Sequence, residues 1–498
     1  MLSIVYTPAS FLEVIMEFVD IFDTDVPAKV LAEHCSRSKP GADKISYKSF
    51  KTHFPQEIGE IKTRISNNKY KFTRFEIMLK AKKHYKLPRL IFKSSIRDRL
   101  VAKLMSEYLY QYYDERGYSP TKTRDGVLSI IHGAINEQLS SGNFKYNYFL
   151  RLDISNYFDS INRQLLISQL EKDGLDEHFI FLIKKLFYTM DLSIDVPNGK
   201  GVPQGISVSS ILAERYLKEL DEKYCSSFFK GFVCFIRYVD DILILTSDEN
   251  THNYIRKETI FNLQSTYGLV INPDKISEGD LNKDSVDFLG TSINGRNICI
   301  SAAQLARVKA QLDELFMWYR RVSKTRNHPL YAKKDRALKA LTERLNLLIT
   351  GYIYQNPAKD KKGRYGWIQT SLPRQIDNID SLKILDRYVS CLIHTHIQDI
   401  EQRKIIFQNC KSFFMAFCKS KFTENEDGYI LDREKVSQNK DVMYEITCNL
   451  SVVDLKYGLG DQYNKKLFED SVGESLYRHF CKSLYIANRD LTTDILYW

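Results

Sequence analysis

The most regular apolar pattern in the chain lies in residues 234–245, which read CFIRYVDDILIL. Two runs rich in β-branched and aromatic residues flank Asp240 and Asp241, a composition typical of strands buried on one face. The pattern predicts a β-hairpin whose tight turn carries the two acids. Because unpaired carboxylates resist removal from water, such a buried hairpin favours a bound cation. An ordinary solvated turn is the alternative for this segment alone, since Asp is common in turns.

A second apolar run ends on an acid in residues 149–161, which read FLRLDISNYFDSI. The run predicts a strand that ends at Asp153, and Phe158 follows five positions later. If this strand delivers its carboxylate to the same point as Asp240 and Asp241, the three acids form a two-metal site. In such a site Mg²⁺, or Mn²⁺ in its place, activates an attacking oxygen and steadies the leaving oxygen. The sequence therefore indicates phosphoryl-transfer chemistry.

Helical periodicity dominates much of the remaining chain. Apolar residues at helical spacing predict helices in residues 11–21 and 338–348, and further helices are expected in 103–113 and 126–134. Residues 365–498 are rich in aromatic side chains and are expected to be mostly helical. The mixture of strands and helices predicts an α+β protein.

Length and composition limit the class of protein. A chain of 498 residues is long enough for two or three domains, and its net charge of +10 suits a polyanionic partner. Acidic residues interrupt the apolar stretch near the N-terminus, so neither a signal peptide nor a membrane span is expected. Nine cysteines without a C-x-x-C pair indicate reduced thiols and a cytoplasmic protein.

A Gly/Pro-rich turn at residues 199–210, GKGVPQGISVSS, lies between the two acidic segments. Alone, it is a turn that enters a helix. In this order, however, the three segments resemble the palm of reverse transcriptases, which carries an Asp-x-x-x-x-Phe/Tyr strand, a Pro-Gln-Gly turn and a Tyr-x-Asp-Asp hairpin. Here these motifs correspond to residues 153–158, 203–205 and 238–241.

Three further segments extend the resemblance over about residues 39–300. Residues 40–45, PGADKI, resemble the element that precedes the fingers in group II intron, non-LTR and retron-type reverse transcriptases. Residues 267–275 resemble the motif that follows the catalytic hairpin, and residues 288–290 resemble the primer-grip hairpin.

The resemblance implies a right-hand polymerase, with fingers and a palm built on an RRM-like antiparallel sheet with helices. A mostly α-helical C-terminal region follows. The expected boundaries are an N-terminal helical extension at 1–38, fingers at 39–145, a palm at 146–300 and the C-terminal region at 301–498. The last is expected to be either a thumb-like bundle or a helical-repeat module.

The resemblance assigns catalysis to four residues: Asp153, Asp240, Asp241 and Lys275. The three acids are the expected metal ligands. Lys275 would protonate the pyrophosphate leaving group, and a plain surface lysine is the alternative. Arg237, beside the catalytic hairpin, is expected to brace it by ion pairing.

Four further residues are expected to bind the incoming nucleotide. Arg89 matches the arginine of the fingers that meets the phosphates, since a guanidinium engages two phosphate oxygens at once. Lys82 matches a neighbouring position less closely. Phe158 would lie under the sugar and exclude a 2′-hydroxyl, and Gln204 would touch the nucleotide from the Pro-Gln-Gly turn.

Taken together, these features predict a nucleotidyltransferase, an RNA-directed DNA polymerase of a bacterial anti-phage defence system of the abortive-infection type. The resemblance to this type rests on a retron-like palm and on Ser209-Ser210-x-x-Ala213-Glu214 after the turn. No RNase H, zinc-knuckle or HNH signature is found in the sequence. Alternatives are a retron or intron-derived enzyme, a template-independent DNA polymerase, and an RNA-binding scaffold, which the intact acidic triad argues against.

The expected partners follow from this function. They are an RNA, as template or dedicated non-coding RNA, the DNA product and deoxynucleoside triphosphates. Priming by a protein side chain remains open. The protein is expected to form a homo-oligomer, and no association with a membrane is expected.

Overall fold

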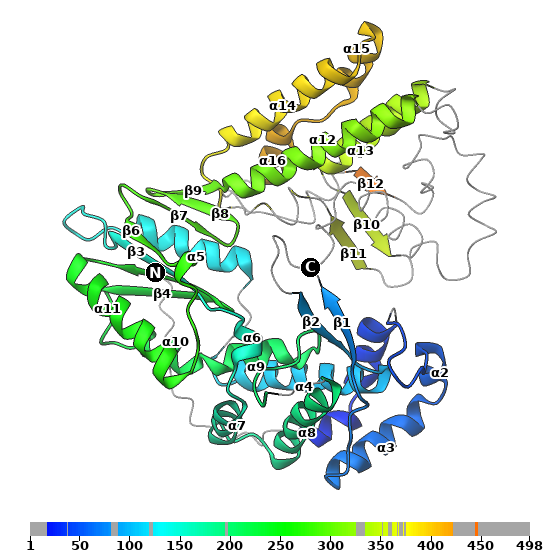
Figure 1. Cartoon of the computed structure of the whole chain (residues 1–498), viewed down its shortest axis with the longest axis vertical. Helices are drawn as coiled ribbons and strands as arrows, with labels where there is room; N and C mark the ends of the chain where they lie inside the picture. The colour runs from blue at the N-terminus through cyan, green and yellow to red at the C-terminus, as the bar shows by residue number, and fades with distance from the viewer. Residues whose placement is uncertain are drawn as a thin grey trace, which may run out of the picture. The chain divides into compact units, whose positions relative to one another are not determined.

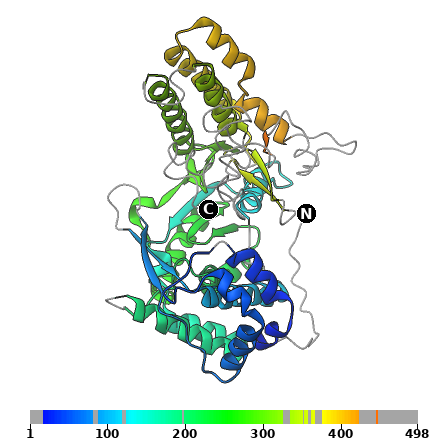
Figure 2. The ribbon, with the colours of Figure 1, turned by 90° about the vertical axis from the view of Figure 1, so that its right-hand side faces the viewer.

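The computed structural model describes residues 17–36, 38–80, 88–118, 123–194, 198–324, 334–350, 352–356, 361–365, 367, 372, 375–421 and 444–446. The chain divides into two compact units, Met1–Leu281 and Asn282–Trp498. Figure 1 labels their elements, and Figure 2 shows the same ribbon turned by 90°. Each unit is described by itself.

The first unit contains an antiparallel hairpin, a four-stranded sheet and the helices that pack around them. Its strands are β1 (Glu76–Lys80), β2 (Arg89–Lys93), β3 (Tyr148–Asp153), β4 (Val233–Tyr238), β5 (Asp241–Thr246) and β6 (Ser277–Asp280). Its α-helices are α1 (Val26–Val30), α2 (Tyr47–Thr52), α3 (Phe54–Ser66), α4 (Ile96–Asp114), α5 (Arg124–Asn136), α6 (Tyr157–Ser160), α7 (Arg163–Lys172), α8 (Glu177–Ser193), α9 (Val208–Tyr216), α10 (Lys218–Cys225) and α11 (Glu249–Phe261). Its shorter helices are η1 (Phe18–Asp23), η2 (Leu31–Cys35), η3 (Asn262–Thr266) and η4 (Pro273–Lys275).

The four-stranded sheet has the order β4-β5-β3-β6, and all its neighbours are antiparallel. Helices separate β3 from β4 and β5 from β6, so the chain follows the β-α-β-β-α-β path of ferredoxin-like and RRM-like sheets. Helix α11 packs against β3 and β5, and α10 packs against β4. The predicted α+β fold with an RRM-like antiparallel sheet is therefore confirmed.

Strand β5 is buried more completely than the sequence predicted. Its four apolar residues, Ile242, Leu243, Ile244 and Leu245, are all fully buried. Successive side chains point to opposite faces of a sheet, so both faces of β5 are covered and not one. Its place between β4 and β3 explains the continuous apolar run, which would otherwise alternate with polar residues.

The hairpin of β1 and β2 leads into α4 through a buried carboxylate. Ser95 caps α4 by accepting a hydrogen bond from the Asp98 N–H. The fully buried Asp98 carboxylate accepts the Tyr70 hydroxyl and the Thr73 N–H, each at 2.7 Å, and pairs with Arg97 at 3.1 Å. This carboxylate ties the segment before β1 to the first turn of α4.

A close backbone approach explains one glycine of the 40–45 segment. A Cβ atom on Gly41 would lie 2.6 Å from both the Cα and the backbone nitrogen of Ser95. Any side chain there would push this turn away from the start of α4.

The second unit combines two small sheets with long helices. Its strands are β7 (Ser285–Phe288), β8 (Thr291–Asn294), β9 (Asn297–Ile300), β10 (Tyr352–Asn356), β11 (Lys361–Tyr365) and β12 (Tyr444–Ile446). Its helices are α12 (Ala302–Lys324), α13 (Lys334–Thr350), α14 (Asp380–His396), α15 (Ile400–Asn409) and α16 (Phe413–Lys421). The 285–300 segment, which the sequence assigned to the palm, belongs to this unit.

Helix α12 packs against α13 and α14, while α16 packs against α13 and α14. The buried residues Leu338, Leu341 and Leu345 show the helical spacing read from the sequence. Across the ranges that the structure describes, no helix combines the length and apolar character needed to cross a lipid bilayer.

Replacing Asp98 by Ala should lower the free energy of unfolding by about 3 kcal/mol, because it leaves the buried Tyr70 hydroxyl, the Thr73 N–H and the partly buried Arg97 without their common acceptor. Urea denaturation followed by circular dichroism measures the loss. Asp114→Ala, at an exposed position of the same helix, is the control and should stay within about 0.5 kcal/mol of the wild type. Equal losses for the two variants would contradict the anchoring role of Asp98.

Candidate active site

The sheet brings two of the predicted acids together through its strand register. Asp153 is the last residue of β3 and lies directly opposite Asp241, the first residue of β5. Tyr238 pairs with Asp241 on the other side, so Val239 and Asp240 form a two-residue loop between β4 and β5. Like charges placed directly across a strand pair repel, so this register carries an electrostatic cost that a cation would relieve.

The loop that carries Asp240 has an unusual backbone. Val239 has φ of 58°, in the left-handed region, and Asp240 does not. In a two-residue hairpin loop this conformation at the first position is the one that glycine favours. A β-branched residue there costs on the order of 1–3 kcal/mol and persists only where its surroundings hold it.

Two basic side chains contact the paired acids. Lys275 places Nζ 2.7 Å from Oδ1 of Asp153, and Arg151 places Nη2 3.5 Å from Oδ1 of Asp241. Lys275 ends the short helix η4, whose cap Asn272 also donates its backbone N–H to the Asp153 carbonyl at 2.9 Å. The segment after α11 thus binds the end of β3.

The electrostatics of the acids reflect their burial and proximity. Burial and, to a smaller extent, the charge of Asp241 raise the pKa of Asp240 to about 6, while the charge of Arg89 opposes the shift. Burial also raises the pKa of Asp241, where Asp153 adds to the effect and Arg151 opposes it. Both carboxylates therefore hold their negative charge at a cost.

The donor set suits a hard divalent cation, because carboxylate oxygens are the preferred ligands of Mg²⁺ and Mn²⁺. The raised pKa of Asp240 agrees with this, because burial and the nearby negative charge of Asp241 disfavour the ionised form of this carboxylate, which a cation would stabilise. Among the residues that the structure describes, however, no group of three or more acidic, histidine or cysteine side chains lies close enough together to hold an ion. The contacts of Lys275 and Arg151 occupy oxygens that a metal would use.

Phe158 lies in the turn that follows β3. Asn156, with φ of 47°, reverses the chain and α6 begins at Tyr157. The half-buried Phe158 accepts the Val202 N–H on its carbonyl at 2.8 Å. This hydrogen bond joins the Asp153 segment to the Pro-Gln-Gly turn.

Gln204 links that turn to the hairpin of β1 and β2. Its carbonyl accepts the Phe92 N–H at 2.7 Å, and its side-chain amide donates to Oδ1 of Asp159 at 3.2 Å. The next residue, Gly205, has φ of 97°, and a Cβ atom on it would lie 2.7 Å from the Phe92 carbonyl oxygen. Glycine is therefore required where the turn crosses β2.

Of the remaining predicted residues, Arg89 begins β2 and is exposed, near enough for its charge to act on Asp240. Lys82 lies outside the described residues. Two contacts were missed by the sequence analysis, those of Arg151 and Asp159. Arg151 stands two residues before Asp153 and so on the same face of β3, a signal that strand periodicity contains.

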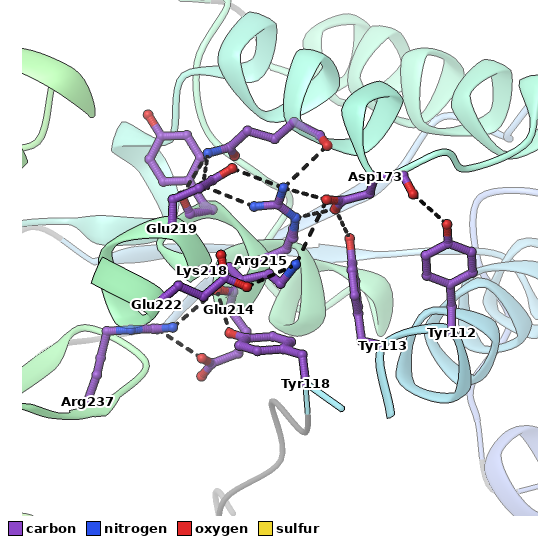
Figure 3. A network of polar contacts seen from close by, with 12 residues as sticks. Tyr112, Tyr113, Tyr118, Asp173, Glu214, Arg215, Lys218, Glu219, Glu222 and Arg237 are labelled. Carbon is purple, nitrogen blue, oxygen red and sulfur yellow. Dashed lines mark hydrogen bonds and ion pairs between the residues drawn. The ribbon is translucent and has the colours of Figure 1, made fainter. Parts of the chain in front are cut away.

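The predicted brace around Arg237 is confirmed as part of a buried polar network (Figure 3). The Arg237 guanidinium pairs with Glu214 at 2.9 Å and with Asp221. Nearby, Arg215 pairs with Asp173 and with Glu219. Both arginine side chains are almost completely buried, at 3% and 2% exposure.

Comparison with known families identifies the segment that carries this site. Residues 80–293 match the family model described as reverse transcriptase (RNA-dependent DNA polymerase). They include Asp153, Asp240, Asp241, Lys275 and the Pro-Gln-Gly turn. This segment is therefore a reverse-transcriptase domain, and the predicted α+β fold class of fingers and palm is confirmed.

Similarity to individual proteins is more distant. The chain is 24% identical over 231 residues to Protein YkfC of Escherichia coli (strain K12), a match that covers 39% of this chain and 60% of that protein. Among solved structures, telomerase from Candida albicans with a fragment of telomeric RNA matches with a TM-score of 0.39 and 13% identity, over 79% of this chain and 68% of that one. Apo telomerase from Candida tropicalis matches with a TM-score of 0.40 and 13% identity, over 74% and 70%.

Replacing Gly205 by Ala should destabilise the first unit more than replacing Gly199 does. Both glycines have positive φ, but a Cβ atom on Gly199 meets nothing within 4 Å. Gly199→Ala should therefore cost about 1 kcal/mol for its backbone alone, and Gly205→Ala at least about 1 kcal/mol more for the clash with β2. The midpoints of urea denaturation give the difference, and equal midpoints would exclude the close approach.

Proposed function

We propose that this chain, whose residues 80–293 form a reverse-transcriptase domain, is an RNA-directed DNA polymerase that extends a DNA strand by nucleotidyl transfer. The observation that carries the proposal is the direct pairing of Asp153 with Asp241, beside the loop of Asp240, within the matched segment. Three carboxylates on adjoining strand ends are the donor set that phosphoryl transfer through two metal ions requires.

In this proposal Asp153, Asp240 and Asp241 hold Mg²⁺, or Mn²⁺ in its place. The bound cations would supply charge neutralisation and activation of the attacking hydroxyl. Lys275 would release Asp153 when the metal binds and donate its proton to the departing pyrophosphate. The support for this role is its ammonium group, which lies 2.7 Å from Oδ1 of Asp153, one of the proposed metal ligands.

The nucleotide would lie between the palm and the hairpin of β1 and β2. Arg89, exposed at the start of β2, would bind the triphosphate together with Lys82. Gln204, on the turn that crosses β2, would contact the nucleotide from the other side. Phe158 would lie under the sugar and exclude ribonucleotides, because its ring leaves no room for a 2′-hydroxyl.

The proposed partners are an RNA, the DNA product and deoxynucleoside triphosphates. The net charge of +10 supports a polyanionic partner, since basic residues bind phosphates without reading sequence. We further propose a cytoplasmic homo-oligomer in which residues 301–498 act as a thumb-like or helical-repeat module.

For the biological role we propose anti-phage defence of the abortive-infection type. Its support is the resemblance of the palm motifs, including Ser209-Ser210-x-x-Ala213-Glu214. A retron or intron-derived enzyme and a template-independent polymerase are the alternatives. Sequencing the nucleic acid that co-purifies with the protein separates them: a dedicated non-coding RNA with its DNA copy supports templated synthesis, and DNA without any RNA template supports the template-independent class.

Asp153→Asn and Asp240→Asn should each reduce deoxynucleotide incorporation at least about 10³-fold, since each removes a ligand that stabilises the transition state. Incorporation with Mg²⁺ on an RNA template with a DNA primer measures the effect. Asp274→Asn, at an exposed position beside Lys275, is the control and should keep wild-type activity. Retained polymerisation in either ligand variant, with an unchanged melting temperature, would refute the site.

Phe158→Ala should raise the ratio of ribonucleotide to deoxynucleotide incorporation efficiency about tenfold or more, because it opens space beside the sugar. Single-nucleotide incorporation on the same template gives kcat/KM for each substrate. The control is Phe228→Ala, which removes a ring that is 76% exposed in the loop before β4. A ratio that does not move in Phe158→Ala would exclude the steric role.

A further inference from the structure

Arg237 and Glu214 both lie beside the backbone of Val239, the left-handed residue of the loop between β4 and β5. Arg237 donates from Nη1 to the Val239 carbonyl at 3.0 Å. The Val239 backbone N–H lies close enough to the Glu214 carboxylate to oppose the burial that raises the pKa of that group. The two side chains also pair with each other, Nη1 to Oε2 at 2.9 Å, so the hydrogen bond to the Val239 carbonyl comes from one member of a buried ion pair.

This ion pair is fixed by the helices around it (Figure 3). Arg237 Nε donates to Oδ1 of Asp221 on α10 at 2.8 Å, and Nη2 donates to the Glu214 carbonyl on α9 at 3.2 Å. Tyr118 donates its hydroxyl to Asp221 at 3.3 Å. The Glu214 side chain is 15% exposed, so solvent screens the pair little.

The conformation of Val239 explains why its backbone needs such contacts. A β-branched residue avoids positive φ, and without restraint this loop would relax toward a conformation that valine prefers. That relaxation would rotate the peptide that leads into Asp240 and Asp241. The hydrogen bond that holds the Val239 carbonyl therefore fixes the backbone from which the Asp240 and Asp241 side chains extend.

We propose that the Arg237–Glu214 ion pair is a positioning device that holds Val239 left-handed and so presents Asp240 and Asp241 to a divalent cation. The inference rests on the proposed function, because it takes these acids as metal ligands. Neither Arg237 nor Glu214 touches the metal or the substrate in this scheme. They act through the backbone of the loop.

The test measures Mn²⁺ affinity of the full 498-residue chain by the electron paramagnetic resonance signal of free Mn²⁺, without nucleotide. Arg237→Lys keeps the buried charge but loses the planar fork that reaches Val239, Glu214 and Asp221 together. Its Mn²⁺ affinity should fall about tenfold or more, as is usual when the partners of metal ligands are lost.

Glycine at position 239 separates positioning from simple bracing. Because glycine adopts positive φ without a steric penalty, Val239→Gly combined with Arg237→Lys should recover most of the lost Mn²⁺ affinity. The control is Arg215→Lys, at a buried arginine of the same network that pairs with Asp173, directly after α7, and with Glu219 on α10. It should lower the melting temperature and leave Mn²⁺ affinity unchanged.

Three results would overturn the inference: wild-type Mn²⁺ affinity in Arg237→Lys, an equal loss in Arg215→Lys, or no recovery from Val239→Gly. If Arg237→Lys does not fold, Glu214→Gln replaces it under the same criteria, since it removes the ion pair from the other side. The proposed function fails separately, if the wild type binds Mn²⁺ no more tightly than the Asp153→Asn/Asp240→Asn double variant.

Discussion

The pairing of β3 with β5 is the constraint on which the site depends. Four fully buried apolar residues of β5 lie against Phe149–Leu152 of β3, which are apolar except for Arg151, and this pairing places Asp153 opposite Asp241. A slip of one residue would move every buried side chain to the other face of the sheet, so hydrophobic burial specifies the register strongly. The mutual repulsion of the two acids is small beside that burial. The fold thus imposes on the carboxylates a proximity that they would not adopt alone.

Buried charge is the second feature that shapes this unit. Arg163, Arg215 and Arg237 are all buried, and each has an acidic partner. Desolvation makes such pairs weak sources of stability, whereas a broken pair leaves a buried charge without compensation. These buried pairs are better explained by the backbone segments that the arginines hold in place. Arg163 donates to the Gly201 carbonyl before the Pro-Gln-Gly turn. Arg237 donates to the Val239 carbonyl in the loop between β4 and β5.

Much of the fold follows from the sequence, because apolar runs and their bounding acids are local signals. The apolar segments around Asp153 and around Asp240 and Asp241 became β3, β4 and β5 as predicted. Burial of β5 on both faces could not be derived, since it depends on strands that are distant in sequence. The contact of Gln204 with Asp159 and the left-handed Val239 were missed for the same reason. Each follows from how separate segments meet, and valine in particular gives no local sign of positive φ.

Helix α9 explains why the three palm motifs occur in one compact order. At its start, Ser209 donates its hydroxyl to the Pro203 carbonyl at 2.7 Å, which fixes the turn that carries Gln204. In its last turn, the Ala213 carbonyl accepts the Tyr157 hydroxyl beside Phe158. The next residue, Glu214, pairs with Arg237 at 2.9 Å, and Arg237 donates to the Val239 carbonyl in the loop between β4 and β5. A helix of nine residues therefore links the turn that carries Gln204 to the loop of Val239 and Asp240. The Ser-Ser-x-x-Ala-Glu pattern thus has a physical basis, because Ser209 binds the turn and Glu214 binds Arg237, which in turn holds the loop.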